Sequence, residues 1–407
     1  MKLNIHSYNL FYLFICIIWI PVQRYYLHVD GGARSIMVLS LIAVILNYST
    51  FFHRKDLFRS TPFVCWTLLV AFSFINSMVK GFSSEKGTLN FILGNFLLPY
   101  VFLVTAIIEL DYDQNRCLKI VLIAQLIYIF LGFTNISVAI GERSVDEELG
   151  NMLPLTATGL MFVVGVLLCN HQLKGGWLTF GIITTFVITI IVGTATRKAL
   201  GATVLAFTGV ILGYTKKFNL KTLLLLVIFT IVLYKGMDYI LESTLIGERL
   251  ASSSETFDVP LSSNPKVNSF LMTVLGDRTL QYYMVFQMFS QHPVTGVGLN
   301  NYMSLTQSEN RLHTEYMVQL FENGLIGISL LIVFYIALFN GLNKKRKTGE
   351  NNMMYLFGIL MVLFLNLTAW TYNMHYIMII YAIIISYVHS TPIHNENSHS
   401  SPQKQLQ

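Results

Sequence analysis

Long apolar runs govern what this chain can fold into. We count twelve runs near the length of about 20 residues that an α-helix needs to cross a bilayer. They lie near residues 8–28, 35–52, 63–79, 88–109, 117–139, 153–170, 176–194, 197–214, 219–236, 318–340, 353–369 and 373–389. Charged residues make up only 12% of the chain, about half the share found in a typical soluble domain. The sequence therefore predicts an all-α polytopic membrane protein with about 12 transmembrane helices.

The apolar runs divide the chain into four parts. Residues 1–236 hold the first nine predicted helices, 237–317 form one large loop, 318–389 hold the last three helices, and 390–407 form a polar tail that we expect to be disordered. A loop of about 80 residues usually has a function, and we expect short helices within it. The first run resembles a signal peptide, but it lacks an A-x-A-like cleavage site, so we interpret it as a retained first helix.

Lysine and arginine are distributed unevenly between the two ends of the predicted helices. Fifteen fall in the N-terminus, the tail and the loops that follow even-numbered helices, and seven fall in the opposite short loops. Positive charge in short loops is retained in the cytoplasm, and long loops do not follow this rule. Both termini are therefore predicted to be cytoplasmic, and the loop 237–317 is predicted to lie on the outer face of the membrane.

Several kinds of site are not indicated by the sequence. The net charge of +6 is small and dispersed, without the basic patch of a nucleic-acid-binding surface. The four cysteines lie in or beside apolar runs without CxxC spacing, so we interpret them as small apolar residues of helices. We find no nucleotide-binding or metal-binding motif. No metal, cofactor or nucleic acid is expected.

Two arginines stand at predicted helix starts on the outer face. Arg197 opens the eighth run in GTATRKALG, and Arg278 follows Asp277 in GDR before an amphipathic stretch. A helix N-terminus presents free N–H groups and a positive dipole, which together with arginine suit a phosphate. The alternatives are a side chain that reaches the lipid headgroups for Arg197 and a surface ion pair for Arg278. Two such positions on one face favour a pyrophosphate site.

His313 precedes the tenth predicted helix and is the candidate base of the site. A histidine titrates near neutral pH and can accept a proton from a hydroxyl group. Glu315 or Glu322 can orient it or act as base instead, and the alternative is a polar residue of the membrane interface. Gly324 and Gly327 follow in the same helix, and we interpret them as points where a neighbouring helix approaches closely.

Further candidates for substrate binding surround these three residues. Gly296 and Gly298 form a tight turn in PVTGVG, and Arg311 and Glu315 flank His313. Arg143 lies in the acidic segment GERSVDEELG, where it can help to bind an anionic lipid. Solvated charge is the alternative interpretation of that segment.

Taken together, these motifs resemble the O-antigen polymerase and O-antigen ligase family. The resemblance rests on the dozen predicted spans, an arginine opening a mid-chain span, GDR and PVTGVG in the large loop, and His313 before Gly324 and Gly327. Nine residues separate Thr314 from Gly324, as in the ligases, but Thr314 stands where Asn, Ser or Gln is usual. The motifs cover residues 197–327, and the rest of the chain matches in hydropathy alone.

The resemblance implies a metal-independent glycosyltransferase on the outer (periplasmic) face of the bacterial inner membrane. Its donor would be an oligosaccharide on undecaprenyl pyrophosphate, and its other partners would be membrane lipid and a chain-length regulator protein. By the same resemblance, Arg197 and Arg278 would hold the pyrophosphate and His313 would position or deprotonate the attacking hydroxyl.

Three functions remain open at this stage. The first is a polymerase of lipid-linked repeat units of O-antigen or capsular polysaccharide, and the second is a ligase that transfers the finished glycan to lipid A–core. A transporter or flippase is the third, but it is expected to have repeated halves and charged groups at mid-membrane. The predicted spans here are nearly free of charge, which favours the enzymes.

Overall fold

The computed structural model describes residues 4–21, 33–53, 57–80, 98–136, 147–193, 197–215, 278–299, 301–306, 312, 314–367 and 374–390. Within these ranges the chain is helical with short connections and contains no strand. This confirms the all-α prediction for the described part of the chain. The ninth predicted span and most of the first half of the large loop lie outside it.

The described helices follow the apolar runs of the sequence. They are α1 (Ile5–Pro21), α2 (Ala33–His53), the 3-10 turn η2 (Leu57–Arg59), α3 (Thr61–Lys80), α5 (Leu98–Ile136), α6 (Glu147–Cys169), α7 (Gly176–Gly193), α8 (Arg197–Thr215), α12 (Arg278–Gln291), α13 (Tyr302–Thr306), α14 (Glu315–Lys347), α15 (Met353–Asn366) and α16 (His375–His389). The short helices α12 and α13 lie within the predicted large loop, as expected.

Four of these helices are long and apolar enough to cross a membrane. They are α3, Leu98–Gly132 of α5, Lys198–Thr215 of α8, and α14, and six further described helices are apolar but shorter. The fold therefore has the character of a multi-pass membrane protein, while the number of twelve spans stays a prediction.

Two predicted spans, 88–109 and 117–139, meet without a loop between them. The single helix α5 contains the described part of both spans, residues 98–136, and its backbone leaves the helical conformation at Asp113 (φ −150°, ψ 86°). The Asp113 carboxylate accepts a hydrogen bond from the backbone N–H of Arg116, 3.0 Å away, which is the geometry of an N-cap. The capping residue Asp113 therefore separates the two segments of α5, where the sequence predicted a loop.

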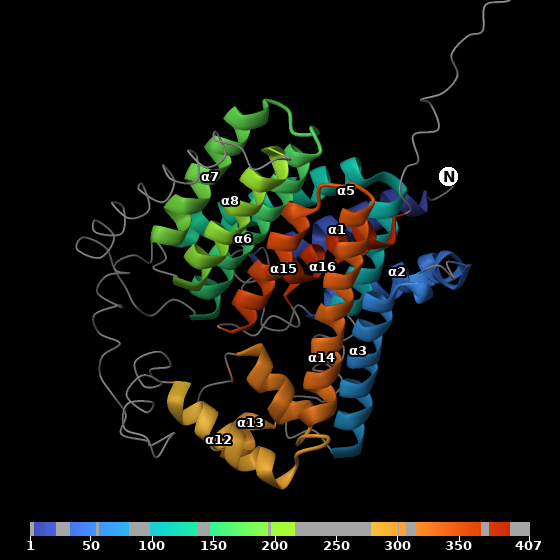
Figure 1. Ribbon diagram of the computed structural model, residues 1–407, viewed down its shortest axis with the longest axis vertical. Helices are drawn as coiled ribbons and strands as arrows, with labels where there is room; N and C mark the ends of the chain where they lie inside the picture. Colours follow the sequence, from blue (N-terminus) through green and yellow to red (C-terminus); the bar gives the residue numbers. More distant parts are fainter. Residues whose placement is uncertain are drawn as a thin grey trace, which may run out of the picture.

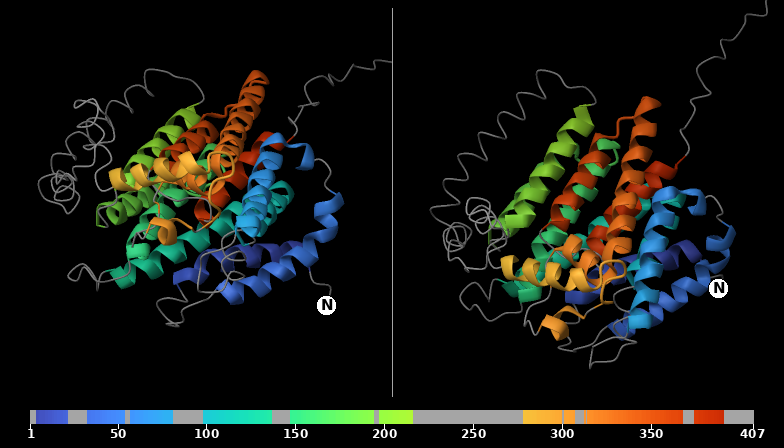
Figure 2. Two further views of the ribbon diagram at one scale, coloured as in Figure 1. Left: turned by 90° about the horizontal axis from the view of Figure 1, so that it is seen from below. Right: turned by 60° about the horizontal axis from the view of Figure 1, so that its bottom comes forward.

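Helices from distant parts of the sequence lie side by side in the bundle. Figures 1 and 2 show α3 beside α14, and Figure 1 shows α12 and α13 at one end of the bundle, below the other helices. α15 packs against α8, and α1 and α16 both pack against α5. The start of α14 lies at the end of the bundle that carries α12, and its basic last turn lies at the other end.

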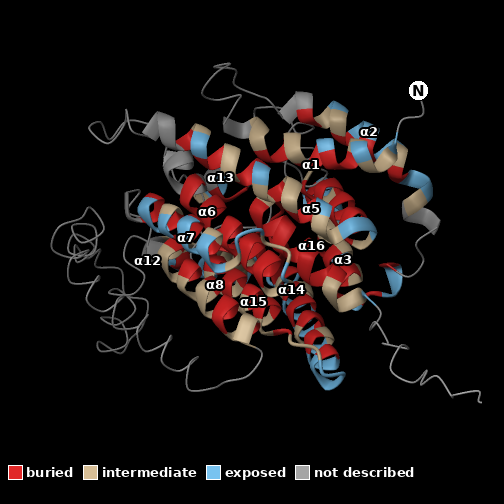
Figure 3. Cartoon of the chain, turned by 90° about the horizontal axis from the view of Figure 1, so that it is seen from above, coloured by how far each residue is buried: buried red, intermediate tan, exposed pale blue. Residues whose placement is uncertain are grey.

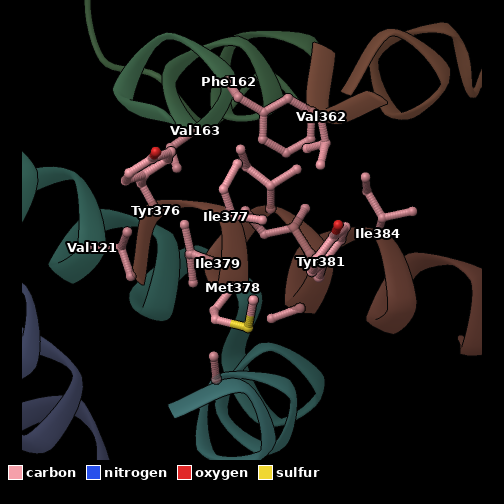
Figure 4. Packing of buried hydrophobic residues seen from close by; sticks show 14 of the residues in the cluster. Val121, Phe162, Val163, Val362, Tyr376, Ile377, Met378, Ile379, Tyr381 and Ile384 are labelled. Carbon is pink, nitrogen blue, oxygen red and sulfur yellow. The ribbon is translucent and has the colours of Figure 1, made fainter. Parts of the chain in front are cut away.

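The core of the bundle is built around α16. Ile377, Met378, Ile379 and Ile380 are all inaccessible to solvent, although consecutive residues of a helix point in different directions. A helix that is apolar on every side must be surrounded by protein or lipid. Figure 4 shows Ile377, Met378 and Ile379 enclosed by neighbouring helices, with Phe162 and Val163 of α6 on one side and Val121 of α5 on another.

Peripheral helices expose apolar side chains instead. On α7, Leu178 and Ile182 are 74% and 64% exposed, and Figure 3 shows exposed positions on the outward side of α7 and α2. The hydroxyls of Thr185 and Thr189 on α7 donate to backbone carbonyls four residues earlier. A polar group bonded to its own helix can face hydrocarbon at little cost, so this surface suits lipid contact.

Candidate functional site

The helix α14 is broken at Gly324, near the end of the bundle that carries α12. The backbone there adopts φ 61° and ψ −154°, a conformation open in practice to glycine alone. The break separates a short polar segment, 315–323, from a long apolar one, 325–347. At 1.5 Å per residue the second segment measures roughly 35 Å, which is enough to span a bilayer by itself.

The turn that follows α12 satisfies the carbonyls freed by this break. The N–H of Val297 donates to the carbonyl of Phe321 at 3.0 Å, and the N–H of Gly298 donates to the carbonyl of Glu322 at 2.9 Å. A helix that stops inside a membrane protein leaves such carbonyls without partners. The turn therefore replaces the hydrogen bonds that the helix would have supplied.

The same turn also satisfies the N–H groups on the other side of the break. The N–H of Leu325 donates to the carbonyl of Pro293 at 2.8 Å, and the N–H of Ile326 donates to that of Val294 at 3.2 Å. We call this arrangement, formed by residues 293–298 and 321–326, the junction. It fixes the C-terminal end of α12 to the bend of α14.

Glycines allow the two backbones of the junction to approach each other. A Cβ atom on Gly324 would lie 2.5 Å from the Gly296 nitrogen and from the Val294 carbonyl oxygen. Gly296 also has a positive φ of 66°, and a Cβ there would lie 2.5 Å from the Phe321 oxygen. The prediction that Gly324 meets a neighbouring helix is therefore wrong, because its neighbour is the turn after α12. Gly327 faces Gln319 and Asn323 of its own helix.

Two polar residues of α3 hold the junction from a third side. The amide nitrogen of Asn76 donates to the carbonyls of Thr295, at 2.7 Å, and Glu322, at 2.9 Å. The Ser77 hydroxyl accepts a hydrogen bond from the N–H of Leu299 at 3.2 Å. Asn76 is 6% exposed and Ser77 is fully buried, so these polar groups lie inside the protein.

The short segment of α14 carries a buried row of polar side chains at four-residue spacing. The amide of Gln319 donates to the Glu315 carboxylate at 2.9 Å, and the amide of Asn323 donates to the Gln319 oxygen at 2.8 Å. None of the three is more than 2% exposed. Glu315 stands in the first turn of α14, where the helix dipole favours a carboxylate.

Thr314 links the start of α14 to two other elements. Its hydroxyl lies 2.8 Å from the hydroxyl of Tyr282 on α12 and 3.4 Å from the carbonyl of Leu367, just after α15. Thr314 is 3% exposed and Tyr282 is 9% exposed. Leu312, Val318 and Val285 pack in one apolar cluster with Phe321 beside this contact. The starts of α12 and α14 are thus held together.

The start of α8 lies at the same end of the bundle. α8 and α15 pack antiparallel, because Gly201 faces Phe364 whereas Gly209 faces Phe357. The beginning of α8, at Arg197, therefore lies beside the end of α15, next to the Leu367 carbonyl that Thr314 contacts. The starts of α8, α12 and α14 converge on one region.

The residues that form this region match a known family. Residues 160–332 match the family model described as O-antigen ligase. Over this segment the chain is similar to the O-antigen ligase family, which supports the resemblance seen in the sequence. The match contains the starts of α8, α12 and α14 and the whole junction. No curated protein matches the chain.

Similarity to the O-antigen ligase family supports a coarse function. The family is of the glycosyltransferase type and acts on lipid-linked oligosaccharides.

The structure describes the predicted site only in part. Arg197 and Arg278 are the first residues of α8 and α12, so both predicted helix starts are confirmed. Their side chains lie outside the described residues, as do the whole of His313, Arg311 and Arg143. The roles given to these five residues stay predictions.

The three remaining candidates can be placed in full. Glu315 is buried and hydrogen-bonded to Gln319. Gly296 and Gly298 are buried, and their N–H groups donate to the carbonyls of His292 and Glu322. These bonds give the two glycines a structural part in the junction, and their part in substrate binding stays a prediction.

Sequence reasoning missed three residues that organise the region: Tyr282, Asn76 and Gln319. Asn76 had a detectable signal, because it is a polar residue in the apolar run 63–79, and such residues usually have a partner inside the protein. Tyr282 had no signal, since an amphipathic helix carries tyrosine for many reasons.

Proposed function

We propose that the protein is a polymerase of lipid-linked oligosaccharide repeat units. The bond between the anomeric carbon of the growing glycan and undecaprenyl pyrophosphate breaks, and the pyrophosphate leaves with the electron pair. A hydroxyl oxygen of the next lipid-linked repeat unit forms the new glycosidic bond to that carbon. Its proton passes to the base of the site and then to solvent, so no cofactor or co-reactant is required.

The observation that carries this proposal is the convergence of three helix starts. Arg197 begins α8, Arg278 begins α12, and Thr314, which follows His313, contacts both α12 and the end of α15. Negative charge develops on the pyrophosphate as it leaves, and cations with helix N-termini stabilise it where it forms. We assign this task to Arg197 and Arg278.

The attacking hydroxyl is a weak nucleophile and needs a base or a positioning group within hydrogen-bond reach. We assign that task to His313, with Glu315 orienting the imidazole. Glu315 suits this task because Gln319 holds its carboxylate in place and because it stands two residues after His313. Arg143, Arg311 and membrane lipid complete the proposed binding of the anionic carrier.

The ligase is the second candidate, and one observation favours it: the matching family model is described as O-antigen ligase. The chemistry of the donor is the same in both cases, and only the acceptor differs, being lipid A–core for the ligase. The broken helix α14 also resembles the discontinuous helices of transporters. In transporters the freed backbone groups bind the substrate, whereas here residues 293–298 occupy them, which argues against that function.

The deciding experiment is a gel of surface polysaccharide from a deletion strain of the producing bacterium. A polymerase predicts that the lipid core carries a single repeat unit in this strain and that the plasmid-borne gene restores long chains. A ligase predicts a core without any repeat unit, together with lipid-linked polymer in the membrane. Unchanged long chains in the deletion strain would exclude both enzymes.

A further inference from the structure

The contact between Tyr282 and Thr314 joins the two segments that carry the proposed chemistry. The Tyr282 and Thr314 hydroxyl oxygens lie 2.8 Å apart, and the Thr314 hydroxyl also donates to the carbonyl of Leu367 at 3.4 Å. Both side chains are buried. A buried hydrogen bond between hydroxyls is sensitive to small displacements of either partner.

The place of Tyr282 on α12 makes this contact important for the start of that helix. Tyr282 stands four residues after Arg278, so the two positions fall on the same face one turn apart. Val285 continues this face, is fully buried and belongs to the cluster with Leu312. The face of α12 that carries Tyr282 and Val285 therefore lies against the start of α14.

Thr314 is next in the chain to the second candidate residue, His313. Thr314 follows His313 directly and precedes the first residue of α14. Its side chain makes no capping hydrogen bond to α14, although threonine is a common cap. Instead, the hydroxyl contacts Tyr282 of α12 and the carbonyl of Leu367 at the end of α15.

We propose that Tyr282 and Thr314 form a positioning pair that sets the start of α12, where Arg278 stands, against the start of α14. This inference rests on the proposed function of the site. The leaving pyrophosphate and the attacking hydroxyl must be held at a fixed separation, and a misplacement of about 1 Å can cost on the order of a hundredfold in rate. The junction fixes the C-terminal end of α12, and the pair fixes its beginning.

The test uses the full chain in lipid nanodiscs, with the strain's own undecaprenyl-pyrophosphate-linked repeat unit as substrate. Tyr282→Phe removes one hydroxyl, Thr314→Val removes the other at nearly constant shape, and Thr314→Ser keeps it. We expect Tyr282→Phe and Thr314→Val each to lower kcat about tenfold with KM within about twofold, since pyrophosphate binding is retained. Thr314→Ser should restore most of kcat.

A double-mutant cycle separates positioning from general damage. Because both substitutions break the same contact, Tyr282→Phe combined with Thr314→Val should be no slower than the slower of the two single variants. The matched control is Tyr283→Phe, which removes the same group from the neighbouring, exposed tyrosine of α12 and should leave kcat unchanged. Retention of wild-type kcat in Tyr282→Phe, or multiplication of the two effects, would overturn the inference.

Two further variants distinguish this inference from the proposed function. Arg278→Ala and His313→Ala, measured in parallel, should both lose turnover. If they lose it while the pair variants retain kcat, only the positioning inference fails. If both retain it, the assignment of the site itself fails. Should Tyr282→Phe not fold, the comparison of Thr314→Val with Thr314→Ser decides the inference on folded protein.

Discussion

Gly324 and Gly296 carry the most constrained backbone of the described chain, because each combines a positive φ with a backbone neighbour where a Cβ would stand. The two glycines belong to segments that the sequence presented as unrelated motifs, a turn in a loop and a pair in a helix. Their tertiary contact explains both.

Gly324→Ala should destabilise the folded protein. The positive φ costs on the order of 1–3 kcal/mol for a residue with a Cβ, and the forced separation of the two backbones costs about 1–3 kcal/mol more. The measurement is the thermal unfolding midpoint in detergent, followed by fluorescence-detected size exclusion. Gly181→Ala in α7 is the control, because a Cβ there meets nothing within 4 Å; equal midpoints for both variants would contradict the structure of the junction.

Removal of either cation or of the base should abolish turnover without removing the protein from the membrane. For Arg197→Ala and Arg278→Ala we expect a loss on the order of 10²-fold or more, and for His313→Ala about 10²–10⁴-fold. Polymer length and amount on a gel, divided by inserted protein, measure the effect. Lys198→Ala is the control, since it removes the cation next to Arg197, and long chains in all three variants would refute the site.

At the scale of elements, close helix packing decides where a functional group stands. α8 and α15 approach each other through glycines, with Gly201 facing the ring of Phe364 and Gly209 facing the Cβ of Phe357. Because α8 begins at Arg197, any change in this packing moves the beginning of the helix.

Gly201→Ala should therefore lower both stability and turnover. An added Cβ would lie 2.6 Å from the Phe364 ring, and such overpacking costs about 1–3 kcal/mol. Phe364→Leu shortens the opposing side chain and should recover much of the loss in the double variant. The unfolding midpoint and the rate of polymer formation measure this, and purely additive losses would show that the two residues do not meet.

The described helices also show which features of the fold can be predicted from hydropathy. The hydropathy pattern found the described helices, including the separations of α7 from α8 and of α15 from α16. It did not predict that α5 continues without a loop, and it did not predict the break in α14. One capping residue, Asp113, and one glycine, Gly324, interrupt the helical backbone of α5 and α14. Hydropathy averaged over a span does not reveal either, because it is insensitive to a single residue.

At the scale of the whole molecule, the two ends of the bundle carry different groups of residues. The starts of α8, α12 and α14 lie at one end, and the basic last turn of α14, with Lys344, Lys345, Arg346 and Lys347, lies at the other. The distribution of positive charge predicts that the basic end is cytoplasmic.

Cysteine labelling tests this orientation. Tyr283→Cys, on the exposed side of α12, should react with a membrane-impermeant maleimide in cells with a permeabilised outer membrane, whereas Lys347→Cys should react only after lysis. Cys169→Ser is the background, because the other three native cysteines are buried. Labelling in the reverse order would place the proposed site on the wrong side of the membrane for a lipid-linked donor on the outer face.

The sequence by itself determined the helices and their apolar character, because a backbone in hydrocarbon must satisfy its hydrogen bonds locally. It also indicated the candidate residues, since arginine at a helix start suits an anion and histidine can accept a proton near neutral pH. Only the tertiary structure decided that residues 293–298 fill the break in α14, that Asn76 bonds to Glu322, and that Tyr282 meets Thr314. These contacts join residues far apart in the chain, and the shape of the packed bundle, which no local pattern encodes, brings them together.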